Sequence, residues 1–149
     1  MTETDKLREL QVDRLNQSFE NASAFVLLEH VLTFEFKRAE IALVSSFGTE
    51  SAILLHMISQ IDPSTDVVFM DTLKLFKLTQ KYREQLTDLF KLENVKIFKP
   101  EAAELAEHDP QENLWFKDSD KCCEIRKVNT NNRALKPVSY THLTLPTKA

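Results

Sequence analysis

The segment over residues 46–51, with the sequence S-F-G-T-E-S, places a glycine and hydroxyl side chains between two apolar segments. Residues 41–44 before it form the short apolar run of a buried strand, and apolar residues return after it at helical spacing. Gly48, the only glycine in the 149 residues, permits positive φ and a close approach of a ligand to the backbone. Free N–H groups at the start of the following helix favour an anion. The pattern predicts a phosphate or sulfate site, although it is equally typical of an ordinary strand-to-helix turn with a hydroxyl cap.

A second group of reactive side chains consists of the adjacent Cys122 and Cys123, followed by Arg126 and Lys127. Adjacent residues on a helix point about 100° apart, so these two thiols do not easily pair with each other. Thiolates favour iron–sulfur clusters or zinc, which usually take four cysteine ligands, whereas this chain has two cysteines. The residues alone therefore leave open half of a metal site or, more simply, two buried cysteines beside a solvated basic helix end.

The elements that position these groups alternate between strand and helix. Longer segments with helical periodicity separate the apolar runs at residues 41–44 and 66–70 and a third expected strand at residues 95–98. This alternation predicts an α/β fold, a doubly wound parallel sheet with right-handed crossovers. Asp71 directly follows the second run, and ligands of such sheets bind at the carboxyl ends of the strands. We therefore expect Asp71 to lie beside residues 46–51.

Helical periodicity extends over several segments between and around these strands. Helices are expected at residues 4–20, 24–36, about 50–61, 75–92 and 101–108, and a further helix from about residue 118 carries the cysteines. Residues 109–118 are expected to form a loop. The side chains expected to be buried along the 75–92 helix are Phe76, Tyr82, Leu86, Leu89 and Phe90.

Three motifs in this order resemble those of a known family. S-S-F-G-T-E-S at residues 45–51 looks like the PP-loop of the adenine-nucleotide α-hydrolase-like fold, in the form found in reductases of adenylyl sulfate and 3′-phosphoadenylyl sulfate. M-D-T-L-K-L-F at 70–76 and C-C-E-I-R-K-V at 122–128 resemble two further motifs of those reductases. The resemblance covers most of residues 21–136 and implies an incomplete PP-loop fold.

The resemblance assigns roles to named positions. The C-C pair is similar to the first half of a motif in which four cysteines hold a [4Fe–4S] cluster, so Cys122 and Cys123 become the expected metal ligands. Since reductases of 3′-phosphoadenylyl sulfate generally lack this pair, it shifts the expected substrate toward adenylyl sulfate. The expected substrate-binding residues are Ser46, Phe47, Gly48, Ser51, Asp71, Arg126 and Lys127.

The activity that the resemblance implies belongs to sulfate assimilation. A cysteine thiolate would attack the sulfur of the nucleotide and release AMP or adenosine 3′,5′-bisphosphate, and thioredoxin or glutaredoxin would then release sulfite. Neither cysteine of this chain is assigned as that nucleophile, so the fragment is expected to be inactive. Two alternatives stay open: a non-redox PP-loop enzyme that uses ATP, and a nucleotide-binding module without catalysis.

One residue departs from the family pattern within the second motif. Leu73 stands where the family has glycine. Its isobutyl group is expected to crowd the nucleotide or to make the loop move.

Length and charge restrict the remaining interpretations. Residues 1–137 are expected to be the N-terminal part of a single reductase domain, and residues 138–149 a non-native tail with no strand that pairs with the core. The net charge of −4 argues against binding to nucleic acid or to an anionic membrane. The chain has no apolar run near 20 residues and no signal-peptide core, so a cytoplasmic protein is expected. The oligomeric state is left open, a homo-oligomer included.

Overall fold

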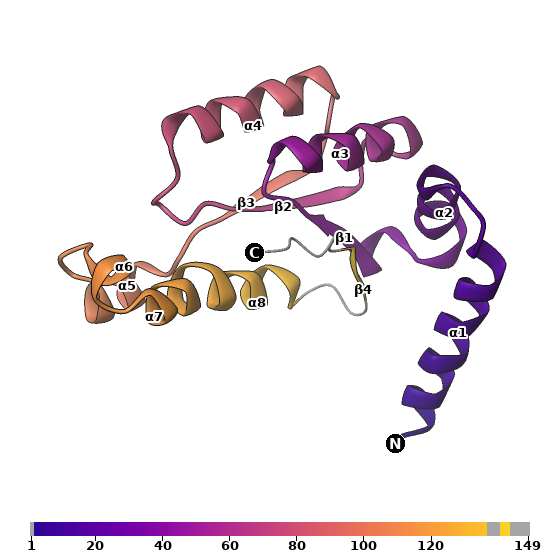
Figure 1. Ribbon diagram of the computed structural model, residues 1–149, viewed down its shortest axis with the longest axis horizontal. Coiled ribbons are helices and arrows are strands. Elements are labelled where there is room, and N and C mark those ends of the chain that lie inside the picture. Colours follow the sequence, from indigo (N-terminus) through magenta and orange to yellow (C-terminus); the bar gives the residue numbers. More distant parts are fainter. Residues whose placement is uncertain (1, 137–140, 144–149) are drawn as a thin grey trace.

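A parallel sheet of four strands forms the centre of the computed structural model, which describes residues 2–136 and 141–143 (Figure 1). The strand order is β3-β2-β1-β4, and every neighbouring pair is parallel. The strands are β1 (Ile41–Val44), β2 (Asp66–Met70), β3 (Val95–Phe98) and β4 (Thr141–Leu143). The first three have the predicted bounds, and the expected α/β fold with a doubly wound parallel sheet is confirmed.

Helices cover the two faces of this sheet (Figure 1). The long connections α3 (Thr49–Ile61) and α4 (Lys77–Leu89) lie on one face, and α8 (Asn129–Leu135) lies on the other. The other elements are α1 (Glu3–Phe19), α2 (Ala24–His30), η1 (Val31–Glu35), η2 (Arg38–Glu40), α5 (Ala102–His108), α6 (Leu114–Lys117), α7 (Ser119–Cys123) and η3 (Glu124–Val128).

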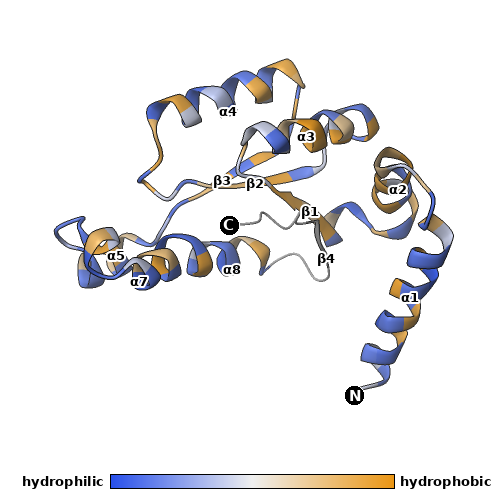
Figure 2. Cartoon of the chain, in the orientation of Figure 1, coloured by the Kyte–Doolittle hydropathy of each residue, from blue (hydrophilic) through white to orange (hydrophobic). Residues whose placement is uncertain are grey.

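The pleat of the strands divides the core between these faces. Leu43 of β1 and Phe69 of β2 are buried with Leu55 of α3, whereas the neighbouring Val68 turns to the opposite face and packs with Ala134 of α8. Successive side chains of a strand alternate between faces, so a strand buried on both sides reads as a continuous apolar run. Figure 2 shows these strands as mostly apolar segments between amphipathic helices.

The expected buried face of the 75–92 helix is partly wrong. Phe76 is 81% exposed, because it precedes the helix as its N-cap, and Leu89 is 70% exposed. Leu86 is buried as expected, and Arg83 shares its face, with the guanidinium carbon 5.1 Å from the ring centroid of Phe69. The buried stripe of α4 is therefore narrower than its sequence periodicity indicates.

Three other expectations are corrected. The expected helix over residues 24–36 continues from α2 into the π-helical turn η1, and the expected loop over residues 109–118 contains the short helix α6. The tail was expected not to pair with the core, but Thr141–Leu143 pairs with Ile41–Leu43 of β1. The rest of the predicted tail lies outside the described residues, and its non-native origin stays a prediction.

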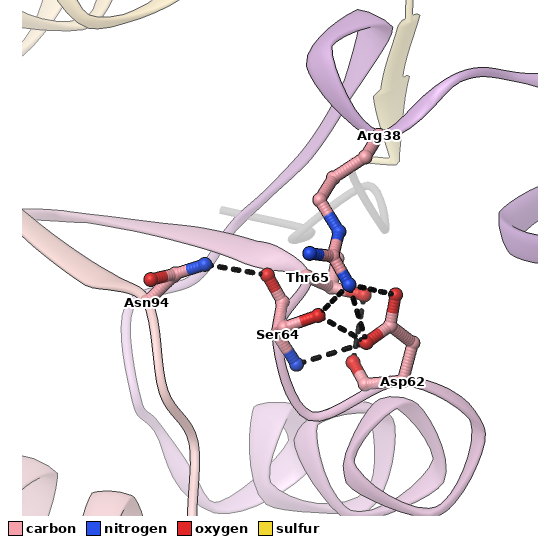
Figure 3. Close-up of polar contacts among 5 residues, drawn as sticks. All are labelled: Arg38, Asp62, Ser64, Thr65 and Asn94. Carbon is pink, nitrogen blue, oxygen red and sulfur yellow. Dashed lines mark hydrogen bonds and ion pairs between the residues drawn. The ribbon is translucent and has the colours of Figure 1, made fainter.

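A polar network closes the amino edge of the sheet, at the turn from α3 into β2 (Figure 3). Arg38 Nη2 donates to both carboxylate oxygens of Asp62, at 3.2 and 3.1 Å, and to the Ser64 hydroxyl. Thr65 Oγ1 donates to the Asp62 carbonyl at 2.8 Å, and Asn94 Nδ2 donates to the Ser64 carbonyl at 2.7 Å. These bonds fix the edge opposite to the one where ligands of such sheets bind. Among the described helices, none is both long and apolar enough to cross a bilayer.

Candidate functional site

Two serine hydroxyls shape the turn from β1 into α3. Ser45 is buried, its N–H donates to the Val68 carbonyl at 2.9 Å, and its hydroxyl accepts from Phe47 N–H at 3.1 Å. The hydroxyl of the exposed Ser46 accepts from Gly48 N–H at 3.3 Å and lies 3.4 Å from the Ser51 hydroxyl. Such serine turns bend the backbone without a second glycine. The turn thus brings Ser46, Gly48 and Ser51 together at the start of α3.

The positive φ angle in this turn belongs to Phe47 and not to Gly48. Phe47 has φ 54°, whereas Gly48 has φ −73° and ψ 171° as the N-cap of α3. The Phe47 ring is 1% exposed and makes an edge-on contact with Phe69, with ring centroids 5.5 Å apart. Phe47 thus adopts a left-handed backbone conformation, which costs a non-glycine residue free energy, while its ring packs against Phe69. The Phe47 side chain therefore faces the core and not the candidate site.

At the end of β2, Asp71 and Thr72 organise the neighbouring loop. Asp71 is 4% exposed, and its Oδ1 accepts from Leu73 N–H at 2.9 Å. The Thr72 hydroxyl accepts from Lys74 N–H at 3.3 Å. Leu73 adopts φ 61°, a left-handed conformation that glycine reaches without steric cost. Asp71 lies at the expected edge of the sheet, and Leu73 carries backbone strain.

The cysteines lie at the end of α7. The carboxylate of Asp118 caps this helix by accepting from Lys121 N–H at 2.9 Å. Cys122 is buried and Cys123 is exposed. No group of three or more His, Cys, Asp or Glu side chains suited to a metal forms within residues 2–136. The thiols have the chemistry of cluster ligands, but the described residues by themselves do not complete a set of four.

Arg126, one turn after the cysteines, is buried instead of being open to a ligand. The residue is 4% exposed; its Nη1 donates to the Thr72 carbonyl at 2.8 Å and its Nη2 donates to Asp109 Oδ2 at 2.6 Å. Lys127, by contrast, is exposed. The structure therefore joins Arg126 to the loop after β2 and leaves Lys127 exposed.

Asp109, which was not among the predicted site residues, carries the opposing charge. Burial by itself raises the pKa of Asp109, but hydrogen bonds from Arg126 and from Leu114 N–H, together with the charges of Arg126 and Lys74, hold it below its ordinary value. Asp109 is thus a carboxylate at neutral pH. The sequence offered no signal for this role, because a single acid before a proline is typical of a surface turn.

The carboxyl edge of this parallel sheet combines a serine–glycine turn, a helix start and an acid at the end of the next strand. This combination is typical of α/β proteins that bind anionic ligands at this edge. The chain belongs to the phosphoadenosine phosphosulfate reductase domain family, whose model matches residues 40–144.

Curated relatives carry reductase names. The chain is 49% identical over 98 residues to an adenosine 5′-phosphosulfate reductase of Mesorhizobium japonicum, covering 66% of this chain and 39% of the relative. It is 38% identical over 131 residues to one from Chelativorans sp., covering 88% and 54%. A phosphoadenosine 5′-phosphosulfate reductase of Klebsiella pneumoniae is 36% identical over 103 residues, covering 67% and 42%. The chain thus spans about half or less of the length of these relatives.

A solved structure supports the fold. The phosphoadenylyl-sulfate reductase of Candida auris, determined as a phosphate complex, superposes with a TM-score of 0.73 at 24% identity. The match covers 87% of this chain and 63% of that one. It confirms the expected PP-loop type of fold.

Proposed function

We propose that this chain forms the nucleotide-binding part of a sulfonucleotide reductase, which reduces adenylyl sulfate or 3′-phosphoadenylyl sulfate to sulfite. The observation that carries the proposal is the convergence of the turn before α3, the loop after β2 and the cysteine-bearing helix, which Arg126 joins to that loop. The names of the relatives support the same activity.

The residues at this edge divide the substrate between them. The hydroxyls of Ser46 and Ser51, the backbone at Gly48 and the first N–H groups of α3 bind the anionic group, because aligned donors and the helix dipole favour negative charge there. Phe47 contributes its backbone while its ring anchors the turn. Asp71 orders the loop that borders the nucleotide, and the exposed Lys127 stabilises negative charge on the sulfate.

The reaction is a nucleophilic displacement followed by thiol exchange. A cysteine thiolate attacks the sulfate sulfur, the bond from that sulfur to the phosphate oxygen breaks, and the nucleotide leaves as AMP or adenosine 3′,5′-bisphosphate. A thiolate of thioredoxin or glutaredoxin then attacks the S-sulfonated cysteine at its thiol sulfur, and sulfite leaves. The donor's second thiol then attacks the resulting mixed disulfide, which forms the donor's disulfide and releases the enzyme cysteine, so the donor loses the two electrons that the sulfur gains.

Cys122 and Cys123 have another role in this proposal. They would supply two of the four thiolates that hold a [4Fe–4S] cluster. This role leaves neither cysteine as the nucleophile. The C-C pair, together with the two relatives named for adenosine 5′-phosphosulfate, favours adenylyl sulfate as the substrate.

Nucleotide titration of the chain, followed by calorimetry, tests the proposal. We expect AMP and adenylyl sulfate to bind without a divalent metal. A preference for ATP with magnesium would favour a non-redox PP-loop enzyme, and failure of all three to bind to the folded chain would contradict a nucleotide site at this edge. Ser46→Ala should weaken AMP binding, whereas Ser59→Ala, which removes a hydroxyl bonded to the His56 carbonyl within α3, is the matched control.

A further inference from the structure

The buried guanidinium of Arg126 links three segments that are far apart in sequence. Its Nη1 binds the Thr72 carbonyl in the loop after β2, 54 residues away, at 2.8 Å. Its Nη2 binds Asp109, which follows α5, at 2.6 Å, and the two side chains are 4% and 1% exposed. Arg126 itself belongs to the π-helical turn η3 directly after the cysteines. One residue therefore connects the cysteine-bearing segment to the candidate nucleotide loop.

The partner carboxylate extends this link. Asp109 Oδ1 accepts from Leu114 N–H at 2.9 Å, so both carboxylate oxygens are engaged. A second connection runs in parallel, because Lys74 Nζ lies 3.1 Å from the Glu112 carbonyl and 3.3 Å from its carboxylate. The loop after β2 is thus attached to the 109–114 segment through Arg126 at Thr72 and directly at Lys74. Between these attachments lies Leu73 at φ 61°.

Direct contact of Arg126 with a ligand is disfavoured by its surroundings. Both of its terminal nitrogens donate to protein oxygens, and its Nε is buried without a hydrogen-bond partner among the described residues. A buried ion pair with an unsatisfied donor is a poor source of stability, since apolar side chains of similar volume often stabilise a fold better. Such a pair is better explained by the conformation that it specifies.

We propose that Arg126 and Asp109 are a positioning pair, which holds the Thr72–Lys74 loop in its strained conformation and in register with the cysteine-bearing helix. The pair acts on the nucleotide through this loop and does not touch it. The effect on the nucleotide rests on the proposed function, whereas the positioning of the loop does not.

Hydrogen exchange of the Leu73 and Lys74 amides measures this role without any ligand. Arg126→Lys keeps the positive charge, but a single ammonium lacks the planar fork that reaches Thr72 and Asp109 together. We expect these two amides to exchange at least about tenfold faster in this variant, while amides of β1 and β2 keep their protection. Arg38→Lys is the matched control, because Arg38 forms the Arg–Asp pair at the opposite edge of the sheet (Figure 3). It should leave the Leu73 and Lys74 amides unchanged.

A double variant separates positioning from stability. Arg126→Met with Asp109→Leu removes both charges and leaves no buried charge without a partner. We expect a melting temperature close to that of the parent chain, faster exchange at Leu73 and Lys74, and at least tenfold weaker AMP binding. Unchanged exchange at these amides in either folded variant would overturn the proposal, as would a uniform loss of protection through β1 and β2. If the parent chain binds no AMP but the variants show faster exchange at Leu73 and Lys74, the positioning pair is supported and the proposed function is contradicted.

Discussion

At the scale of single residues, the strain in the candidate site lies at Leu73. Its φ of 61° costs a non-glycine residue about 1–2 kcal/mol, and a glycine recovers this cost, less the entropy that it adds to the unfolded chain. We expect Leu73→Gly to raise the free energy of unfolding by about 0.5–1 kcal/mol in urea denaturation. Removing the isobutyl group should also strengthen AMP binding, because the side chain is 47% exposed beside the candidate site.

Lys91 offers the matched control for this variant. It has φ 52° directly after the C-cap of α4, a position that commonly takes glycine. Lys91→Gly should stabilise the chain by a similar amount without changing AMP affinity. A loss of stability in Leu73→Gly, with a gain in Lys91→Gly, would show that the Leu73 side chain contributes more than its backbone costs.

Gly48 adopts a backbone conformation that does not require glycine. Its φ of −73° is open to any residue, and a Cβ placed there would meet the Ser46 hydroxyl at an ordinary 3.4 Å. We therefore expect Gly48→Ala and Gly48→Val to change the melting temperature only slightly. The valine, whose branched side chain covers the helix start, should weaken AMP binding by more than tenfold in calorimetry. Unchanged affinity in the valine variant would remove this turn from the site.

Sequence patterns predicted some of these residues and not others. Asp71 was found because the residue that ends a buried strand in an α/β sheet lies at the ligand edge. The burial of Phe47 was missed, because its position in a polar turn hides the contact with Phe69. The pairing of Arg126 with Asp109 was missed because 17 residues and a turn of unpredicted shape separate them.

At the scale of elements, strands were predicted more accurately than short helices. A strand buried on both faces needs a continuous apolar run, which β1 and residues 67–70 of β2 have. β3 lies at the edge of the sheet and includes the exposed Lys96. The four-residue α6 is too short to show a helical period in its sequence, and its Trp115 and Phe116 are exposed. The narrow buried face of α4 depends on where the helix begins, which packing decides and periodicity does not.

One carboxylate collects polar contacts that attach α1 to the body of the protein. Glu35 of η1 accepts from Gln11 at 2.6 Å, pairs with Arg14, and lies 3.1 Å from His30 Nε2. The hydrogen bond from Gln11 lowers the pKa of Glu35; burial raises it, but the His30 hydrogen bond and the charges of Arg14 and His30 keep it below its ordinary value. Among the described residues of α1 none is buried, so few apolar contacts replace this network.

This arrangement predicts a pH-dependent attachment of α1. Because the folded pKa of Glu35 is depressed, its contribution is present above the ordinary value of 4.5 and is lost as pH falls through the folded pKa. Hydrogen exchange in α1 should therefore accelerate in acid before exchange in β1 and β2 does. In Glu35→Gln the exchange in α1 should be faster at neutral pH and should depend less on pH. An α1 response to acid that this variant leaves unaltered would assign the effect to other carboxylates.

At the scale of the whole molecule, the connections between the first three strands account for the order β3-β2-β1. They do not account for β4, which pairs with β1 on the side away from β2. Right-handed crossovers through α3 and α4 place β2 beside β1 and β3 beside β2. Thr141–Leu143 pairs with β1. The sequence around this segment is rich in threonine, leucine and proline and shows no strand pattern. Backbone pairing with an edge needs no particular side chain, which is why this contact escaped prediction.

The separation of binding from catalysis gives the last prediction. If Cys122 and Cys123 are cluster ligands, the 149-residue chain contains no nucleophile for the sulfate sulfur. Adenylyl sulfate at 100 times its dissociation constant should stabilise the chain by about 2.7 kcal/mol, while thioredoxin and its reductase should release no sulfite from it. Thermal melting and a sulfite assay measure the two effects on one sample. Sulfite release that persists in Cys122→Ser but disappears in Cys123→Ser would make the exposed Cys123 the nucleophile, and the assignment of both cysteines to a cluster would then be wrong.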